Sequence, residues 1–167
     1  MPPPLAYFLT WTTYGTWLPG DDRGWVDKHH NPSQPVIRPP DRATEMAARS
    51  RMAEESARLD GPATAAVSES LRETCRYRGW RLHALSVQSS HVHVVVSAGE
   101  ARPERVLQAL KAYASRALAR LPSLSRRQHW WTEGGSKRFL NDQRSFEAAV
   151  AYVERQDGAP PLHSGGL

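Results

Sequence analysis

The sequence contains a single cysteine, Cys75, among 167 residues, so no disulfide can form within the chain. No apolar run approaches the roughly 20 residues that a membrane-spanning helix needs. The first residues also lack the pattern of a secretory signal, in which a charged segment is followed by an apolar one. These features predict a cytoplasmic protein with no membrane partner.

Charge is present in moderate excess. Lys and Arg total 22 against 17 for Asp and Glu, which gives a net charge of +5 and a pI of about 9.8. This balance favours a polyanionic partner, although an ordinary basic protein has the same composition.

The length fits one domain, which we place at residues 1–157, followed by a tail at 158–167. An irregular insertion rich in Gly, Pro, Asp and Asn is expected at about 16–60. Loops this long in compact domains are usually functional or disordered.

Periodicity and turn residues predict the secondary structure. Strands are expected at 5–14, 80–88 and 91–97, and helices at 43–58, 60–78, 102–121 and 144–156. Residues 129–132 and 136–140 are expected to form a hairpin around Gly134. This order indicates an α+β fold, a ferredoxin-like antiparallel sheet with helices packed on one face.

Two histidines interrupt an otherwise apolar strand. Alternate residues of a strand face the same side, so His91 and His93 point one way together with Val95, while Val92, Val94 and Val96 point the other way. Two imidazoles at this spacing can chelate a divalent ion. A pair of hydrogen-bonded histidines is the alternative, because His-x-His by itself is an unspecific motif.

The last predicted helix offers groups that would complete such a site. Tyr152 and Gln156 are four residues apart and therefore lie on one face of the helix, where they border the apolar stripe through Val153. They can face the sheet. The alternative for Tyr152 is a residue at the edge of the core with its hydroxyl in water.

Taken together, His91-Val92-His93 and the Tyr152 to Gln156 segment resemble the motifs of the Y1, or single-tyrosine, HUH transposases of the IS200/IS605 type, which include the REP-associated tyrosine transposases. The resemblance covers about residues 5–15 and 70–157. Two features depart from the pattern. The insertion is longer than a minimal member needs, and Gln156 is followed by Asp157-Gly158 where the REP-associated branch tends to have Asn-Pro.

The resemblance implies an HUH endonuclease fold and a metal-dependent transposase that cleaves and rejoins single-stranded DNA through a 5′-phosphotyrosine. It implies that Tyr152 is the nucleophile and that His91, His93 and Gln156 hold Mg²⁺ or Mn²⁺. The expected partners are single-stranded DNA with hairpin ends and a second copy of the chain, with a monomer as the alternative, in the prokaryotic cytosol or nucleoid. Other interpretations are a domesticated, non-catalytic nucleic-acid-binding protein and a metal-dependent hydrolase.

Substrate contacts are expected from basic residues and stacking aromatics, the usual combination in proteins that bind single strands. The candidates are Lys111, Arg116, Lys137 and Arg138, with Trp130 and Trp131. Solvated charges and packed tryptophans are the alternatives. No catalytic role is assigned to His29, His30, His83 or His129.

Overall fold

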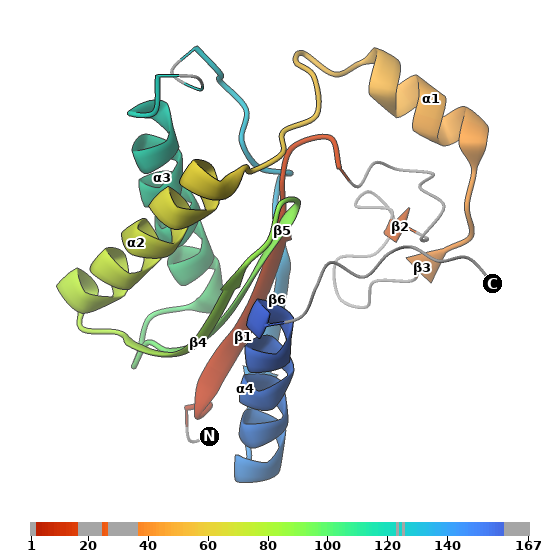
Figure 1. Cartoon of the computed structure of the whole chain (residues 1–167). Helices are drawn as coiled ribbons and strands as arrows, with labels where there is room; N and C mark the ends of the chain where they lie inside the picture. Colours follow the sequence, from red (N-terminus) through yellow and green to blue (C-terminus); the bar gives the residue numbers. More distant parts are fainter. Residues whose placement is uncertain (1–2, 17–24, 27–36, 123, 125, 159–167) are drawn as a thin grey trace.

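The protein is described by a computed structural model that covers residues 3–16, 25–26, 37–122, 124 and 126–158. Within these residues the chain forms a four-stranded antiparallel sheet (Figure 1). Its strands are β1 (Ala6–Thr12), β4 (Arg81–Val87), β5 (His91–Ser97) and β6 (Ser136–Leu140), in the spatial order β4-β5-β1-β6. The predicted histidine strand, β5, therefore lies in the interior of the sheet beside β1.

Helices cover both faces of the sheet. The helices α2 (Gly61–Arg78) and α3 (Pro103–Ala119) pack on one face, and α4 (Gln143–Gly158) packs on the other (Figure 1). The order β1-α2-β4-β5-α3-β6 confirms the ferredoxin-like α+β class. The prediction that the helices share one face was wrong, because Val95 of β5 packs against Ala149 and Val153 of α4.

Both ends of α2 have the capping residues that the sequence predicts. The Asp60 side chain accepts a hydrogen bond from the backbone N–H of Ala63 at 2.9 Å, Pro62 lies in the first turn, and Gly79 ends the helix with a left-handed φ of 71°. A glycine adopts this conformation at little cost.

The insertion is described only in part. It contains the short strands β2 (Trp25–Val26) and β3 (Ile37–Arg38) and the helix α1 (Arg42–Ser50), while His29 and His30 lie outside the described residues. Helix α1 ends at Ser50, well before residue 58, because the following segment is held by burial and by backbone hydrogen bonds to other parts of the chain. Ala57 and Leu59 are buried, and their N–H groups donate to the backbone of Tyr14 and Ser89.

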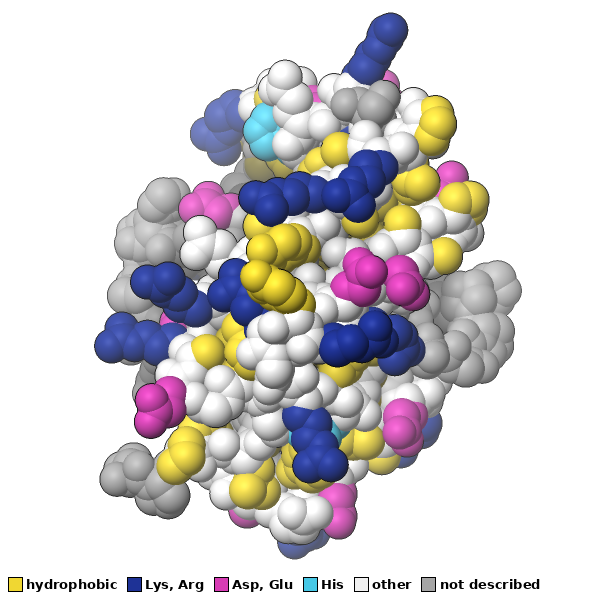
Figure 2. Space-filling model, turned by 90° about the vertical axis from the view of Figure 1, so that its left-hand side faces the viewer, with side chains coloured by type: hydrophobic (Ala, Val, Ile, Leu, Met, Phe, Trp, Pro, Cys, Tyr) yellow, Lys and Arg dark blue, Asp and Glu magenta, His cyan; other side chains and the backbone are white. Residues whose placement is uncertain are grey.

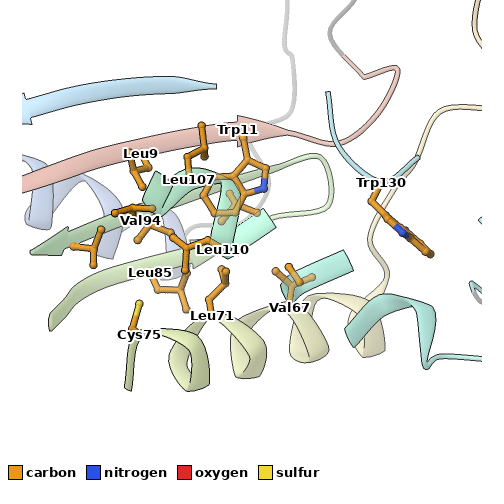
Figure 3. Close-up of a cluster of buried hydrophobic side chains, with 14 of the residues drawn as sticks. Leu9, Trp11, Val67, Leu71, Cys75, Leu85, Val94, Leu107, Leu110 and Trp130 are labelled. Carbon is orange, nitrogen blue, oxygen red and sulfur yellow. The ribbon is translucent and has the colours of Figure 1, made fainter. Parts of the chain in front are cut away.

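The main core lies between the sheet and the α2/α3 pair. Val92, Val94 and Val96 of β5 enter it, as the alternation of the strand predicts. Figure 3 shows Leu9 and Trp11 of β1 in the same cluster with side chains from both helices. Cys75 is buried there as well, and burial raises the pKa of its thiol to about 11. A smaller cluster on the opposite face holds α4.

The predicted hairpin at 129–140 does not form. Trp131 bridges to Thr13, and β6 pairs with β1, so both segments run along β1 rather than along each other. Gly135 makes this path possible, because a Cβ atom at that position would lie 2.8 Å from the backbone oxygen of Thr10. Gly135 thus allows close passage along β1 instead of forming part of a reversing turn.

Among the described residues, no helix is both long enough and apolar enough to cross a membrane.

Candidate active site

The paired strands β1 and β5 present one polar cluster on the face that α4 covers. The register places Thr10 opposite His93 and Thr12 opposite His91, and residues paired across antiparallel strands project to the same side. The two imidazole rings lie 4.8 Å apart between centroids, at an interplanar angle of 67°. The predicted histidine pair therefore forms one local cluster.

His93 is held by contacts on several sides. Its Nδ1 lies 2.9 Å from the Thr10 hydroxyl, and its ring stacks on Phe8 with 5.8 Å between centroids. The ring is 8% exposed. Burial, and secondly the charge of His91, lower the pKa of His93 to about 4. The imidazole of His93 is consequently neutral near pH 7.

Helix α4 places Tyr152 next to this ring. Val153 and Ala149 are buried against the sheet, so the preceding residue, Tyr152, lies at the border of the interface. Its ring is 5.6 Å from the ring of His93 and 6.0 Å from that of Phe8, both in edge-on contact. Tyr152 is nevertheless 41% exposed, which leaves it accessible to a substrate.

Gln156 lies one turn further along, where α4 is tied to the end of β4. The side-chain amide of Gln88 donates to the backbone oxygen of Gln156 at 2.9 Å and to the Ser86 hydroxyl at 2.8 Å. The backbone N–H of Gln88 also donates to the carbonyl of His91. This network holds the last turn of α4 beside the start of β5. Among the described residues, the carboxamide of Gln156 makes no hydrogen bond.

Among those same residues, no cluster of three or more His, Cys, Asp or Glu side chains is arranged to hold a metal ion. A third ligand for the histidine pair from the described part of the chain would therefore be a group of another kind, such as the side-chain amide of Gln156.

The four basic residues predicted to contact DNA do not share one surface. Lys111 donates from Nζ to the backbone oxygens of Thr132 and Gly134, each at 2.8 Å, and so anchors the segment before β6. Arg116 is exposed on α3, on the opposite side of the sheet from Tyr152.

Arg138 and Lys137 are exposed on β6 and project to opposite faces. Arg138 pairs with Phe8 and therefore projects to the face of the histidines, whereas Lys137 pairs with the core residue Leu9 and projects to the other face. Of the four predicted basic residues, Arg138 is the one that the strand register places on the histidine face.

Trp130 and Trp131 pack against other residues of the protein and are not exposed for stacking on bases. Trp130 is 7% exposed. The indole N–H of Trp131 donates to the Lys111 carbonyl and the Ser115 hydroxyl, and its ring contacts Trp11 edge-on. The packing alternative is therefore the one that the structure supports.

The other two histidines within the described residues are held by local partners. His83 lies 2.7 Å from the Ser97 hydroxyl, and His129 lies 2.6 Å from the Glu54 carboxylate.

Thr10 and Phe8 are the site residues that sequence reasoning missed. Alternation along the first strand places both side chains on one face, but only the pairing of β1 with β5 reveals which side chains they meet.

Comparison with known proteins identifies the family of the chain. The family model for IS200-like transposases matches residues 51–156, a segment that includes His91, His93, Tyr152 and Gln156 and excludes β1. The chain therefore belongs to the IS200-like transposase family, whose members act on DNA in transposition. No curated protein matches the chain.

Two solved structures are similar in fold. One is a REP-associated tyrosine transposase bound to a REP hairpin, with 10% identity and a TM-score of 0.48, and the match covers 90% of this chain and 64% of that one. The other is described as a transposase from Deinococcus radiodurans R1, with 18% identity, a TM-score of 0.49 and 95% of each chain covered. The chain thus spans less than two thirds of the length of the first structure.

Proposed function

We propose that this protein cleaves and rejoins single-stranded DNA by transesterification, with Tyr152 as the nucleophile. The observation that carries the proposal is the edge contact of 5.6 Å between the rings of Tyr152 and His93 within one chain. An exposed phenol beside an imidazole pair, of which His93 is buried, brings a nucleophile and candidate metal ligands into one location. Family membership supplies DNA as the substrate class.

The proposed reaction makes one bond at the scissile phosphorus and breaks another. The Tyr152 hydroxyl oxygen bonds to the scissile phosphorus as its proton departs, and the bond from phosphorus to the 3′ oxygen breaks. That oxygen leaves with a proton as a 3′-hydroxyl, and the 5′ end stays on Tyr152 as a phosphotyrosine. Because the ester bond is conserved, attack by a 3′-hydroxyl reverses the step and rejoins DNA without ATP.

His91, His93 and Gln156 are the residues proposed to hold a divalent cation. A histidine ligand must present an unprotonated nitrogen, and the lowered pKa of His93, about 4, meets that condition. Thr10 engages Nδ1, so Nε2 is the nitrogen available for ligation. When bound, the cation would neutralise charge that develops on the phosphoryl oxygens. Two imidazoles and an amide oxygen suit Mg²⁺ or Mn²⁺, and the nitrogen ligands favour Mn²⁺.

The family resemblance extends the proposal to hairpin-bearing DNA in the prokaryotic cytosol, bound by a domain at residues 1–157. Arg138 is the basic residue proposed to contact the strand near the cleavage point, because it projects to the same face as Phe8.

A denaturing gel of end-labelled, hairpin-bearing DNA tests the function. With Mn²⁺ or Mg²⁺, a covalent protein–DNA band is expected that EDTA abolishes. Tyr152→Phe removes only the hydroxyl, so folding and DNA binding should persist while the band disappears. An adduct that persists in this variant would refute the assignment of the nucleophile. Free cleaved product without an adduct would indicate a hydrolase, and binding with neither would indicate a non-catalytic DNA-binding protein.

Mixing two inactive variants tests whether the site is complete in one chain. The test applies if the protein is a homodimer and also if it is a monomer. Tyr152→Phe and His93→Ala are each expected to be inactive. Because Tyr152 contacts His93 of its own chain, mixing the two variants should not restore the adduct. Restored activity would mean that α4 acts on the histidines of the partner subunit.

A further inference from the structure

A basic hollow lies on the face of the sheet opposite Tyr152. It has a volume of about 530 Å³ and is formed where the end of α2 meets the outer side of α3. Its charged lining consists of Arg78, Arg102, Arg105 and Arg116, with Glu100 as the acidic member. Figure 2 views the molecule from the side of α2 and α3, and Lys and Arg side chains are spread over this face among hydrophobic and acidic ones.

The spacing of residues along α3 explains the shape of the hollow. Residues three to four apart share one face of a helix, so Arg105, Ala109, Ala112 and Arg116 form a stripe, and all four line the hollow. The small side chains of the two alanines form the bottom of the hollow. An arginine stands at each end of the stripe, and the two are separated by about 16 Å at 1.5 Å per residue.

Aromatic rings hold two of the guanidinium groups at the rim. Arg78 lies over the ring of Trp80 with 5.6 Å to the centroid, and Arg116 lies over Tyr113 at 5.1 Å. Both rings line the same hollow. These cation–π contacts leave the N–H groups at the guanidinium edges available to accepting oxygens.

Helix stability does not account for two of these charges. Arg102 is the N-cap residue of α3 and makes no side-chain capping bond, and Arg105 lies in the first turn. The positive end of the helix dipole favours acidic residues there and disfavours cations. Together with Arg78 and Arg116, they outnumber the two acidic residues there, Glu100 of the lining and Glu104 of the first turn of α3, and the excess of positive charge favours an anionic ligand.

We propose that this hollow is a second DNA-binding site that holds the phosphodiester backbone away from the cleavage point. The inference rests on the proposed function for the nature of the ligand. An arginine stripe of about 16 Å matches the axial length of about five base pairs of duplex, which suits a backbone better than a single phosphate group. DNA bound there would contact the opposite side of the sheet from Tyr152.

Charge-matched double variants test the proposal. Arg105→Gln/Arg116→Gln removes two charges from the hollow, and Arg72→Gln/Arg76→Gln removes two exposed charges of α2 that do not line it. Both are made in a Tyr152→Phe background, and binding is measured by fluorescence anisotropy over a range of salt concentrations. The DNA probes are a hairpin with a single-stranded flank and an unstructured strand of equal length.

The hollow variant is expected to bind the hairpin at least tenfold more weakly at low salt. The slope of log affinity against log salt should become less steep by about 1.4 to 1.8, because the variant loses two phosphate contacts and each contributes about 0.7 to 0.9 to the slope. The control pair should change the slope by less than half of that. A loss on the hairpin alone would assign the hollow to paired DNA, and an equal loss on both probes to the backbone of either form.

Equal affinities and slopes for the hollow and control variants would overturn the proposal. The outcome is independent of the cleavage chemistry, because the binding assay contains no Tyr152 hydroxyl. Failure of wild-type protein to form an adduct would remove the proposed transesterase function and leave the binding comparison interpretable.

Discussion

Truncation of Val153 to alanine tests how α4 is docked. Val153 is 0% exposed and packs with Ala149 of the same helix against Val95, Ala84 and Leu140. Removing two buried methyl groups costs about 1.6 kcal/mol of transfer free energy, and the cavity raises the loss to about 2–3 kcal/mol. The smaller cluster is the main apolar contact of α4, so this loss should fall mainly on the docking of that helix.

Val67→Ala is the matched control. Val67 is also 0% exposed, but it belongs to the large core on the α2 side. Both variants should lose a similar free energy of unfolding in urea titrations. Only Val153→Ala should favour a local opening of α4, and a cost of 2–3 kcal/mol corresponds to about 30- to 150-fold faster amide exchange there.

Hydrogen exchange followed by mass spectrometry measures this difference. Peptides from 143–156 should exchange faster in Val153→Ala and at the wild-type rate in Val67→Ala under conditions in which both variants are folded. Adduct formation should fall more in Val153→Ala, because the undocked helix removes Tyr152, together with the proposed ligand Gln156, from the side of His93. Equal acceleration of exchange in both variants would show that α4 opens only when the whole domain unfolds, and the reasoning would fail.

Two further predictions concern the buried imidazole. Thr10→Val removes the hydroxyl that lies 2.9 Å from Nδ1 of His93, and calorimetric titration should show Mn²⁺ affinity about tenfold weaker, since such supporting bonds are typically worth 10- to 100-fold. Thr10→Ser keeps the hydroxyl and should bind Mn²⁺ nearly as wild type does; equal affinity in all three proteins would exclude the positioning role. In EDTA, the pKa of His93 is about 4 in the folded protein and near 6.5 when unfolded, so the unfolded state binds more protons between these values. The free energy of unfolding should therefore fall by about 3 kcal/mol as the pH drops from 6.5 to 4, and His93→Gln should flatten that slope in urea titrations; an unchanged slope would contradict the assignment.

Local rules were sufficient for the parts of the site that lie within one element. The alternation of β5 places His91 and His93 together because successive strand residues face opposite sides. The stripe through Val153 places Tyr152 at the border of its helix face, and α2 begins and ends at Asp60 and Gly79 as its cap residues predict.

Contacts between elements were less predictable. The sequence of β5 does not say that β1 lies beside it, so the contacts of His93 with Thr10 and Phe8 emerged only from strand pairing. The position of α4 across the sheet from α2 and α3 likewise depends on apolar residues of three strands, Ala84, Val95 and Leu140, that face the histidine side together. The glycines before β6 resembled a turn, and the close passage of Gly135 along β1 is a tertiary constraint that the sequence does not reveal.

The most direct test of the central claim is to identify the residue that carries the DNA. After reaction with hairpin-bearing DNA and Mn²⁺, nuclease trimming and trypsin digestion release the peptide 145–155, in which Tyr152 is the sole tyrosine. Mass spectrometry should find the residual 5′ nucleotide on that peptide, with fragmentation assigning it to Tyr152. An adduct on any other residue, or cleaved DNA with no adduct at all, would contradict the account.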